Sequence, residues 1–215
     1  MKKLIIIAIF AFSSINLLSN PAFEMLNKAI SKMNNIPNYT CDIELKVDVD
    51  FIKMENRKGK MTFIKPDSVS YQIEGFALLP KVDFMSQIKK LNPKEFTILE
   101  QGSEKINNVD TRIIKIVPNK IEDDIILGQL WIDSKDFIRK VLIYTKQNGK
   151  LEFVIDYSNQ QYPVAKQITL LFDIKEMKLP PGMTGDLNKL KKVDPKKGTT
   201  AGSIIITYNN YKFSK

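Results

Sequence analysis

Few side chains in this sequence could carry out acid–base or metal chemistry. The chain contains no histidine, which is the most versatile acid–base side chain near neutral pH and the commonest metal ligand. Its single cysteine, Cys41, allows neither an intramolecular disulfide nor a cysteine cluster for zinc. No phosphate-binding loop of the G-x-x-x-x-G-K-[ST] type occurs. We therefore expect a protein that is not an enzyme and that holds no metal or cofactor.

Two charged clusters remain as candidates for chemistry. Glu122, Asp123 and Asp124 are adjacent, and paired carboxylates could serve glycoside hydrolysis or weak calcium binding. The simpler interpretation is a solvated loop between two strands. The second cluster is made of Lys189, Lys191, Lys192, Lys196 and Lys197. It could also be a solvated loop, or it could contact anionic lipid head groups.

The first residues have the form of an export signal. Lys2 and Lys3 precede an apolar run over residues 4–12, and small residues reappear near Ser19. The run is shorter than the roughly 20 apolar residues that a membrane-spanning helix needs, and an uncleaved N-terminal anchor is the alternative. We predict a signal peptide over residues 1–19, with no cysteine after it for lipid attachment. The mature chain, a single domain over residues 20–215, should then be soluble in the periplasm.

The positive charge of the chain does not by itself indicate nucleic-acid binding. The formal net charge is +9, and removal of Lys2 and Lys3 with the signal leaves 9 − 2 = +7. No zinc finger, basic zipper or RNP-type motif occurs, and export also argues against a nucleic-acid partner. An excess of lysine instead suits solubility or weak attraction to an anionic membrane surface. We expect a monomer.

The hydrophobic pattern predicts one helix followed by many strands. Residues 22–34 carry apolar side chains at steps of three and four, which is typical of an amphipathic helix, and Pro37 ends it. From Thr40 the period changes to two, the pattern of strands. The predicted strands are 40–51, 59–64, 69–73, 95–101, 110–117, 127–133, 137–146, 150–157, 164–174 and 202–213. Hairpin turns are expected at 107–108 and 148–149.

Two segments interrupt the strands. Residues 75–92 read as an apolar loop and a short helix, and residues 175–201 as a long basic loop. We expect residues 76–91 to form a lid over a cavity, because so apolar a segment must cover or bind something. Its side chains are Phe76, Leu78, Leu79, Phe84, Met85 and Ile88. The strands over 127–146 are apolar on both faces, so their pattern does not fix their register.

The predicted fold is mainly β (α+β), with about ten antiparallel strands and two covering helices in a barrel or strongly curved sheet. The concave face of such a sheet can hold an apolar ligand. Alternation along the strands places these side chains on that face: Leu45, Val47, Val49, Phe63, Tyr71, Ile73, Phe153 and Ile155. The other interpretation of the same pattern is a filled core.

Four stretches of the sequence, in this order, resemble the periplasmic lipoprotein carrier LolA and its relatives. They are 59–71 (GKMTFIKPDSVSY), 112–118 (RIIKIVP), 130–143 (beginning LWID) and 179–183 (LPPGM). Together they span most of the mature chain, which is similar to a diverged member of this lipoprotein-sorting superfamily. The resemblance implies an open half-barrel closed by helices that act as a lid.

The resemblance also implies a function and partners. The apolar interior of the family accepts the acyl chains of lipoproteins, taken from an inner-membrane donor complex and delivered to an outer-membrane acceptor. In the family, an arginine before the motif proline helps to hold the lid shut. Lys65 occupies that position here, and because lysine lacks the planar fork of arginine the latch should be weaker.

Two other functions remain open from the sequence. A related regulatory branch, the RseB-like proteins, uses the same half-barrel as a lipid-sensing binding module and usually carries a second domain. A structural envelope protein whose half-barrel is simply packed is the other possibility. The sequence identifies neither the ligand nor the donor and acceptor.

Overall fold

The structure is a computed structural model, and it describes residues 20–49, 55–73, 88, 95–120, 125–146, 149–158, 161–173 and 201–214. The predicted signal peptide, both charged clusters and most of the predicted lid lie outside these residues. The described elements are α1 (Pro21–Asn34), β1 (Asn38–Val49), β2 (Arg57–Ile64), β3 (Ser68–Ile73), β4 (Phe96–Ile106), β5 (Val109–Pro118), β6 (Ile125–Asp133), β7 (Ile138–Thr145), β8 (Gly149–Tyr157), β9 (Ala165–Asp173) and β10 (Ala201–Ser214).

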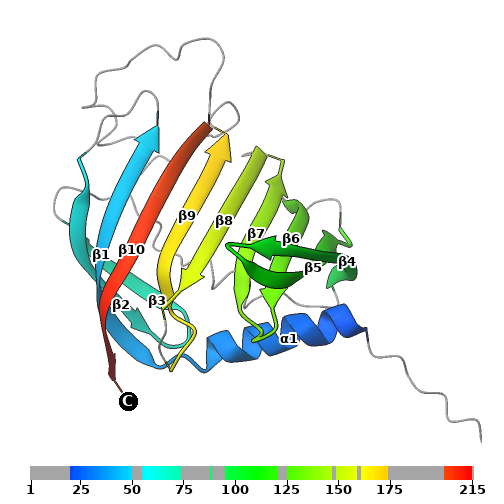
Figure 1. The fold of residues 1–215 in the computed structure, drawn as a ribbon, viewed down its shortest axis with the longest axis horizontal. Coiled ribbons are helices and arrows are strands. Elements are labelled where there is room, and N and C mark those ends of the chain that lie inside the picture. Colours follow the sequence, from blue (N-terminus) through cyan, green and yellow to red (C-terminus); the bar gives the residue numbers. More distant parts are fainter. Residues whose placement is uncertain are drawn as a thin grey trace, which may run out of the picture.

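All ten strands belong to one antiparallel sheet. Their order is β3-β2-β1-β10-β9-β8-β7-β6-β5-β4, so β3 and β4 are the edges of the described sheet, which does not close on itself. Two meanders, β1–β3 and β4–β9, are joined by β10, which lies between β1 and β9 (Figure 1). The prediction of a curved, mainly β fold with about ten strands is confirmed.

Helix α1 lies across one end of the sheet (Figure 1). The Asn20 side chain caps it by accepting hydrogen bonds from the backbone N–H groups of Ala22 and Phe23, and Pro21 occupies the first turn. The predicted start and end of this helix agree with the structure to within one residue. One face of α1 is buried, through the side chains of Ala22, Met25, Leu26, Ala29 and Met33.

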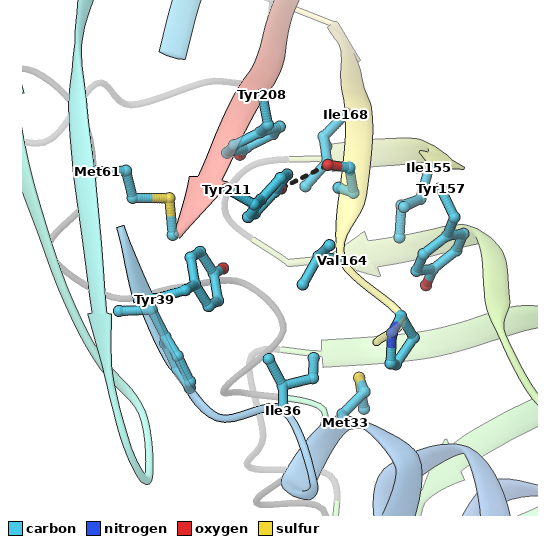
Figure 2. A pocket seen from close by; sticks show the side chains of 13 residues that line it. Met33, Ile36, Tyr39, Met61, Ile155, Tyr157, Val164, Ile168, Tyr208 and Tyr211 are labelled. Atoms are coloured by element: carbon cyan, nitrogen blue, oxygen red, sulfur yellow. Dashed lines mark hydrogen bonds between the residues drawn. The ribbon is translucent and has the colours of Figure 1, made fainter. Parts of the chain in front are cut away.

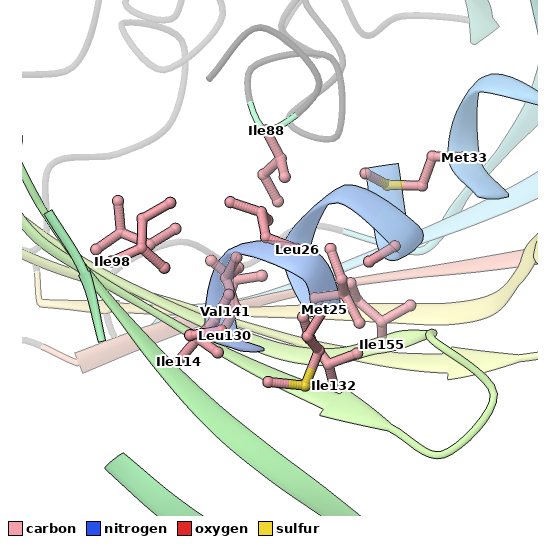
Figure 3. Close-up of a cluster of buried hydrophobic side chains, with 14 residues drawn as sticks. Met25, Leu26, Met33, Ile88, Ile98, Ile114, Leu130, Ile132, Val141 and Ile155 are labelled. Carbon is pink, nitrogen blue, oxygen red and sulfur yellow. The ribbon is translucent and has the colours of Figure 1, made fainter. Parts of the chain in front are cut away.

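Helix α1 covers one face of the sheet, which we call the inner face. The main hydrophobic core lies between α1 and this face. Buried side chains of β4 to β8, including Ile98, Ile114, Leu130, Val141 and Ile155, pack there with the apolar face of α1 (Figure 3). Ile88 also belongs to this core and is 5% exposed. It is the only residue of the second predicted helix that the structure describes, and its backbone is helical.

A second apolar cluster explains why β6 and β7 are apolar on both faces. Trp131, Leu142 and Ile106 are buried together on the outer face, opposite α1. The β4–β5 hairpin reaches over this face toward β8 (Figure 1), and the Asn107 side chain donates a hydrogen bond to Asp156 at 2.8 Å. Burial on both faces removes the alternation from which register is read.

The same hairpin corrects one predicted boundary. We expected a strand over 95–101, but β4 continues to Ile106. Its pairing with β5 shifts between Glu100 and Gly102, and Gly102 has a φ of 118°, which glycine adopts without steric cost. This bulge breaks the alternation that the sequence pattern relied on. The expected turn at Asn107 and Asn108 is present, with φ values of 47° and 65°.

Candidate functional site

The inner face of the sheet carries continuous apolar rows, because residues that pair directly across antiparallel strands share a face. One row runs Leu45, Ile206, Ile168, Ile155. The next row runs Val47, Ile204, Leu170, Phe153, Val141, Leu130, Ile114. Four of the predicted cavity residues, Leu45, Val47, Phe153 and Ile155, therefore lie on one face. Val49 pairs with Gly202 in the next row, but its side chain lies outside what the structure describes.

The predicted residues on β2 and β3 share this face. Phe63 pairs with Tyr39 and with Val69, Tyr71 pairs with Met61, and Ile73 pairs with Gly59. Phe63 is fully buried in an apolar cluster, and Tyr71 and Ile73 pack half-buried against the same cluster. Its other buried members are Cys41, Ile43, Met61, Val69 and Tyr208.

The longer row divides into a covered and an uncovered part. Ile114, Leu130 and Val141 are buried in the core beneath α1. At the other end the side chains are only half-buried, and the Phe153 side chain there packs against the edge of that core. We call these residues the uncovered row, because they are not buried beneath α1 as the others are: Val47, Ile204, Leu170 and Phe153. This row is the candidate binding surface for an apolar ligand, since it is apolar, continuous and partly exposed on the inner face.

A small pocket lies where the C-terminal end of α1 meets the sheet (Figure 2). Its volume is about 60 Å³, whereas pockets for drug-sized ligands are about 300–1,000 Å³. Of the predicted cavity residues, only Phe63 and Ile155 line it. The pocket is therefore a packing defect at one end of the inner face, and it is too small for an acyl chain.

Tyrosines dominate this pocket, and sequence reasoning missed them. Tyr211 donates a hydrogen bond from its hydroxyl to the Ala165 carbonyl at 2.5 Å, and Tyr157 donates to the Ile138 carbonyl at 2.9 Å. Burial raises the pKa of both hydroxyls well above the ordinary value for tyrosine. Both groups are neutral donors that are satisfied by backbone carbonyls, so neither is available as a catalytic base.

Tyr208 and Tyr211 both line the pocket although they are three residues apart. Period-two alternation would place them on opposite faces. The pairing of β1 with β10 shifts between Thr40 and Asp42, and the nearby Asn210 has a φ of 54°. A bulge of this kind changes which side chains point inward, and the sequence pattern contains no signal for it apart from the Asn209-Asn210 pair.

The most buried charged pair has a structural role. The Asp133 carboxylate accepts hydrogen bonds from the backbone N–H groups of Lys135 and Phe137 and from Arg139 Nε, at 2.8, 2.9 and 2.7 Å. These bonds fix the turn between β6 and β7, where Asp136 has a φ of 61°. The Arg139 guanidinium also lies 5.0 Å from the centre of the Tyr157 ring, within range of a cation–π contact. The aspartate of the LWID stretch thus stabilises a hairpin.

Lys65 lies in the turn between β2 and β3, directly before Pro66. Its backbone N–H donates to the Asn38 side chain at 2.8 Å, and the residue is exposed. The lid residues Phe76, Leu78, Leu79, Phe84 and Met85, which a latch would have to hold, are outside the described residues. The latch therefore stays a prediction.

Within the described ranges, no group of three or more Cys, Asp or Glu side chains is arranged to hold a metal ion. In the same ranges, no helix has the length and apolar character required to cross a bilayer.

Three solved structures have the same fold over nearly the whole chain. A DUF1329 family protein from Desulfovibrio piger superposes with a TM-score of 0.55 at 12% identity, covering 91% of this chain and 94% of its own. A LolA superfamily protein from Nitrosomonas europaea gives 0.53 at 11% identity, covering 90% and 94%. A domain assigned to outer membrane lipoprotein sorting from Vibrio parahaemolyticus gives 0.58 at 10% identity, covering 90% and 92%.

Comparison of the sequence alone finds no relatives: no family model matches the chain, and no curated protein matches it. The likeness is thus one of architecture. It agrees with the resemblance that the four short sequence stretches suggested. The chain has the fold of the LolA superfamily.

Proposed function

We propose that this protein is a soluble periplasmic carrier that binds the acyl chains of lipoproteins or other lipids and moves them toward the outer membrane. The observation that carries the proposal is the uncovered row, a continuous set of half-buried apolar side chains on the inner face of an open sheet. Burying such a surface against hydrocarbon is favourable by about 25 cal/mol per Å². An inner-membrane donor, an outer-membrane acceptor and a monomeric state belong to the same proposal.

The composition supports binding rather than catalysis. A chain without histidine and with its single cysteine buried has few groups for nucleophilic or acid–base work. The buried tyrosine hydroxyls and the Asp133–Arg139 pair are occupied in holding the fold. The fold comparison agrees, since two of the three similar structures are named for lipoprotein sorting or for LolA.

The test is lipid content and lipid transfer. Protein purified gently from its native periplasm is extracted with organic solvent and examined by mass spectrometry, and the loaded protein is then mixed with acceptor vesicles. We expect bound lipid in about stoichiometric amount and its release to the vesicles. Protein that is free of lipid and fails to acquire any from vesicles would contradict the proposal.

A matched pair of variants localises the binding surface. Val47→Glu places a carboxylate in the uncovered row, where an unpaired charge is costly against hydrocarbon. Lys46→Glu places the same carboxylate on the outer face of the same strand, where Lys46 is exposed. We expect Val47→Glu to lose bound lipid and Lys46→Glu to keep it, with circular dichroism confirming that both variants are folded. Full lipid content in folded Val47→Glu would remove the uncovered row from the site.

A further inference from the structure

Arg57 places a permanent positive charge on the apolar inner face. It is the first residue of β2 and pairs directly with Leu45, which is 0% exposed. The residues that follow Arg57 on the same face are Gly59, Met61 and Phe63, and the last two are buried. Lys58 and Lys60, which alternate with them, are exposed on the outer face. The sequence pattern gave no reason to single out Arg57 among the many basic residues of the chain.

The guanidinium of Arg57 is incompletely satisfied. Its Nε is buried and has no hydrogen-bond partner among the residues that the structure describes. Arginine stays protonated at any physiological pH, so it cannot relieve this by losing its charge. A buried donor of a charged group without an acceptor is disfavoured, and a bound group that supplies an acceptor would remove this cost.

The acidic residues of the neighbouring strand are directed elsewhere. Asp42 and Glu44 alternate with the inward Ile43 and Leu45, so they point to the outer face. There the Asp42 carboxylate accepts a hydrogen bond from Asn210, and the Glu44 carboxylate accepts one from Asn56. Neither carboxylate shares a face with Arg57.

Arg57 lies beside the uncovered row. Its partner Leu45 is two residues before Val47 on β1, a separation of about 7 Å along a strand. The apolar row runs from Val47 across β10 and β9 to Phe153 on β8, while Arg57 stands on β2, beyond the β1 end of that row. A charge at one end of an apolar stripe matches the form of an amphiphile with a charged head and a hydrocarbon tail.

We propose that Arg57 binds the anionic head group, a phosphate or a carboxylate, of a lipid whose acyl chain occupies the uncovered row. This inference rests on the proposed function and names the ligand class. The Nε and one Nη of a guanidinium present two parallel donors that match two oxygens of such a group. The head group would supply the acceptor that Nε lacks, and the same contact would set which end of the lipid lies at β2.

The experiment compares three probes with one tail length: palmitate, palmitoyl lysophosphatidate and the uncharged monopalmitoylglycerol. Delipidated mature protein is titrated with each probe by calorimetry below its critical micelle concentration. The variants are Arg57→Gln, which removes the charge, and Arg57→Lys, which keeps the charge but loses the paired donors. Lys58→Gln is the matched control, because it removes a charge from the outer face one residue away.

We expect Arg57→Gln to weaken binding of the anionic probes by about 10- to 100-fold, as for loss of a charge-assisted hydrogen bond. Binding of monopalmitoylglycerol should change less than about twofold, and Lys58→Gln should bind all three probes as the parent does. Loss confined to the phosphate or to the carboxylate probe would identify which head group the site takes. Arg57→Lys should fall between the parent and Arg57→Gln, and it serves as the test variant if Arg57→Gln does not fold.

Two results would overturn the inference, and they differ from each other. If the parent binds all three probes and Arg57→Gln binds the anionic ones equally well, the head-group role is wrong while the proposed carrier function stands. If the parent binds none of the probes, the proposed function itself fails and takes the inference with it.

Discussion

Gly59 is the inner-face residue of β2 that cannot carry a side chain. A Cβ placed on it would lie 2.3 Å from the Gln72 carbonyl oxygen and 2.6 Å from Ile73 Cγ1. Gly59 pairs with both Ile43 and Ile73, so the Ile73 side chain occupies the space above it. The glycine that begins the 59–71 stretch is therefore required by close packing of the edge strand β3.

We predict that Gly59→Ala lowers the free energy of unfolding by about 1–3 kcal/mol, the usual range for overpacking. The backbone oxygen of Gln72 cannot move away without loss of β2–β3 pairing. Urea unfolding followed by circular dichroism measures the change, and Lys60→Ala, at an exposed position of the same strand, is the control. Equal midpoints for the two variants would show that β3 moves freely.

Cys41 is a buried thiol whose ionisation is linked to folding. Burial, and to a lesser degree the adjacent Asp42 carboxylate, raises the pKa of the Cys41 thiol from 9.0 to about 12. The folded state therefore holds this proton more tightly than the unfolded state does. The stability that results is fully present below pH 9 and is lost as the pH rises through about 12.

We predict that raising the pH from 8 to 10 lowers the free energy of unfolding by about 1 kcal/mol more in the parent than in Cys41→Ala. The buried Tyr157, whose pKa is also raised, is present in both proteins and cancels in the comparison. Cys41 contributes to the raised pKa of Tyr211, so the difference reports the thiol together with its effect on Tyr211. Urea titrations at both pH values give the difference. Parallel pH dependence in the two proteins would mean that the thiol ionises in the folded state as readily as in the unfolded chain.

At the scale of elements, the segment of the predicted lid lies in the chain between the two edge strands of the described sheet. The chain leaves β3 at one edge and enters β4 at the opposite edge. Between them, Ile88 packs in the core that contains α1 (Figure 3). That residues 76–91 form a lid over the inner face and move when a ligand enters stays a prediction.

We predict that amide hydrogens of residues 76–91 exchange more slowly when palmitate or another bound lipid is present. Exchange read by mass spectrometry in the free and loaded states measures the change, and peptides from β7 should not respond. A Lys65→Met variant tests the predicted latch. If Lys65 contacts the lid, its replacement should speed amide hydrogen exchange of residues 76–91 in the lipid-free protein. Strong and equal protection with and without lipid would instead indicate a fixed part of the core.

Strands were predicted well where one face of the strand is buried and the other is exposed to solvent. β1 and β8 show clean alternation in the sequence, and the structure agrees with both to within about two residues at described ends. The predictions were incomplete where a bulge changes the period, as at Gly102 and at Asn210. A bulge depends on the conformation of one residue and on its partner strand, so local patterns do not reveal it.

For the whole molecule, the fold class follows from the sequence but the strand order does not. Ten alternating segments with short turns lead to a curved antiparallel sheet. The place of β10 between β1 and β9 depends on pairing between residues far apart in the chain, for which the hydrophobic pattern contains no information. The candidate site was predictable only in part. Alternation along each strand predicts which side chains point inward, but the position of Arg57 on the inner face follows from its pairing with Leu45, which the sequence pattern does not contain.

The place of β10 also determines when this protein can fold. Asn38 of β1 pairs with Ser214 of β10, a separation of 214 − 38 = 176 residues. Until ribosomes have made β10, β1 and β9 each expose an unpaired edge, and such non-local pairing is slow to form. Chains arrested before residue 201 should therefore remain protease-sensitive across β1, because the strand that pairs with it has not yet been made.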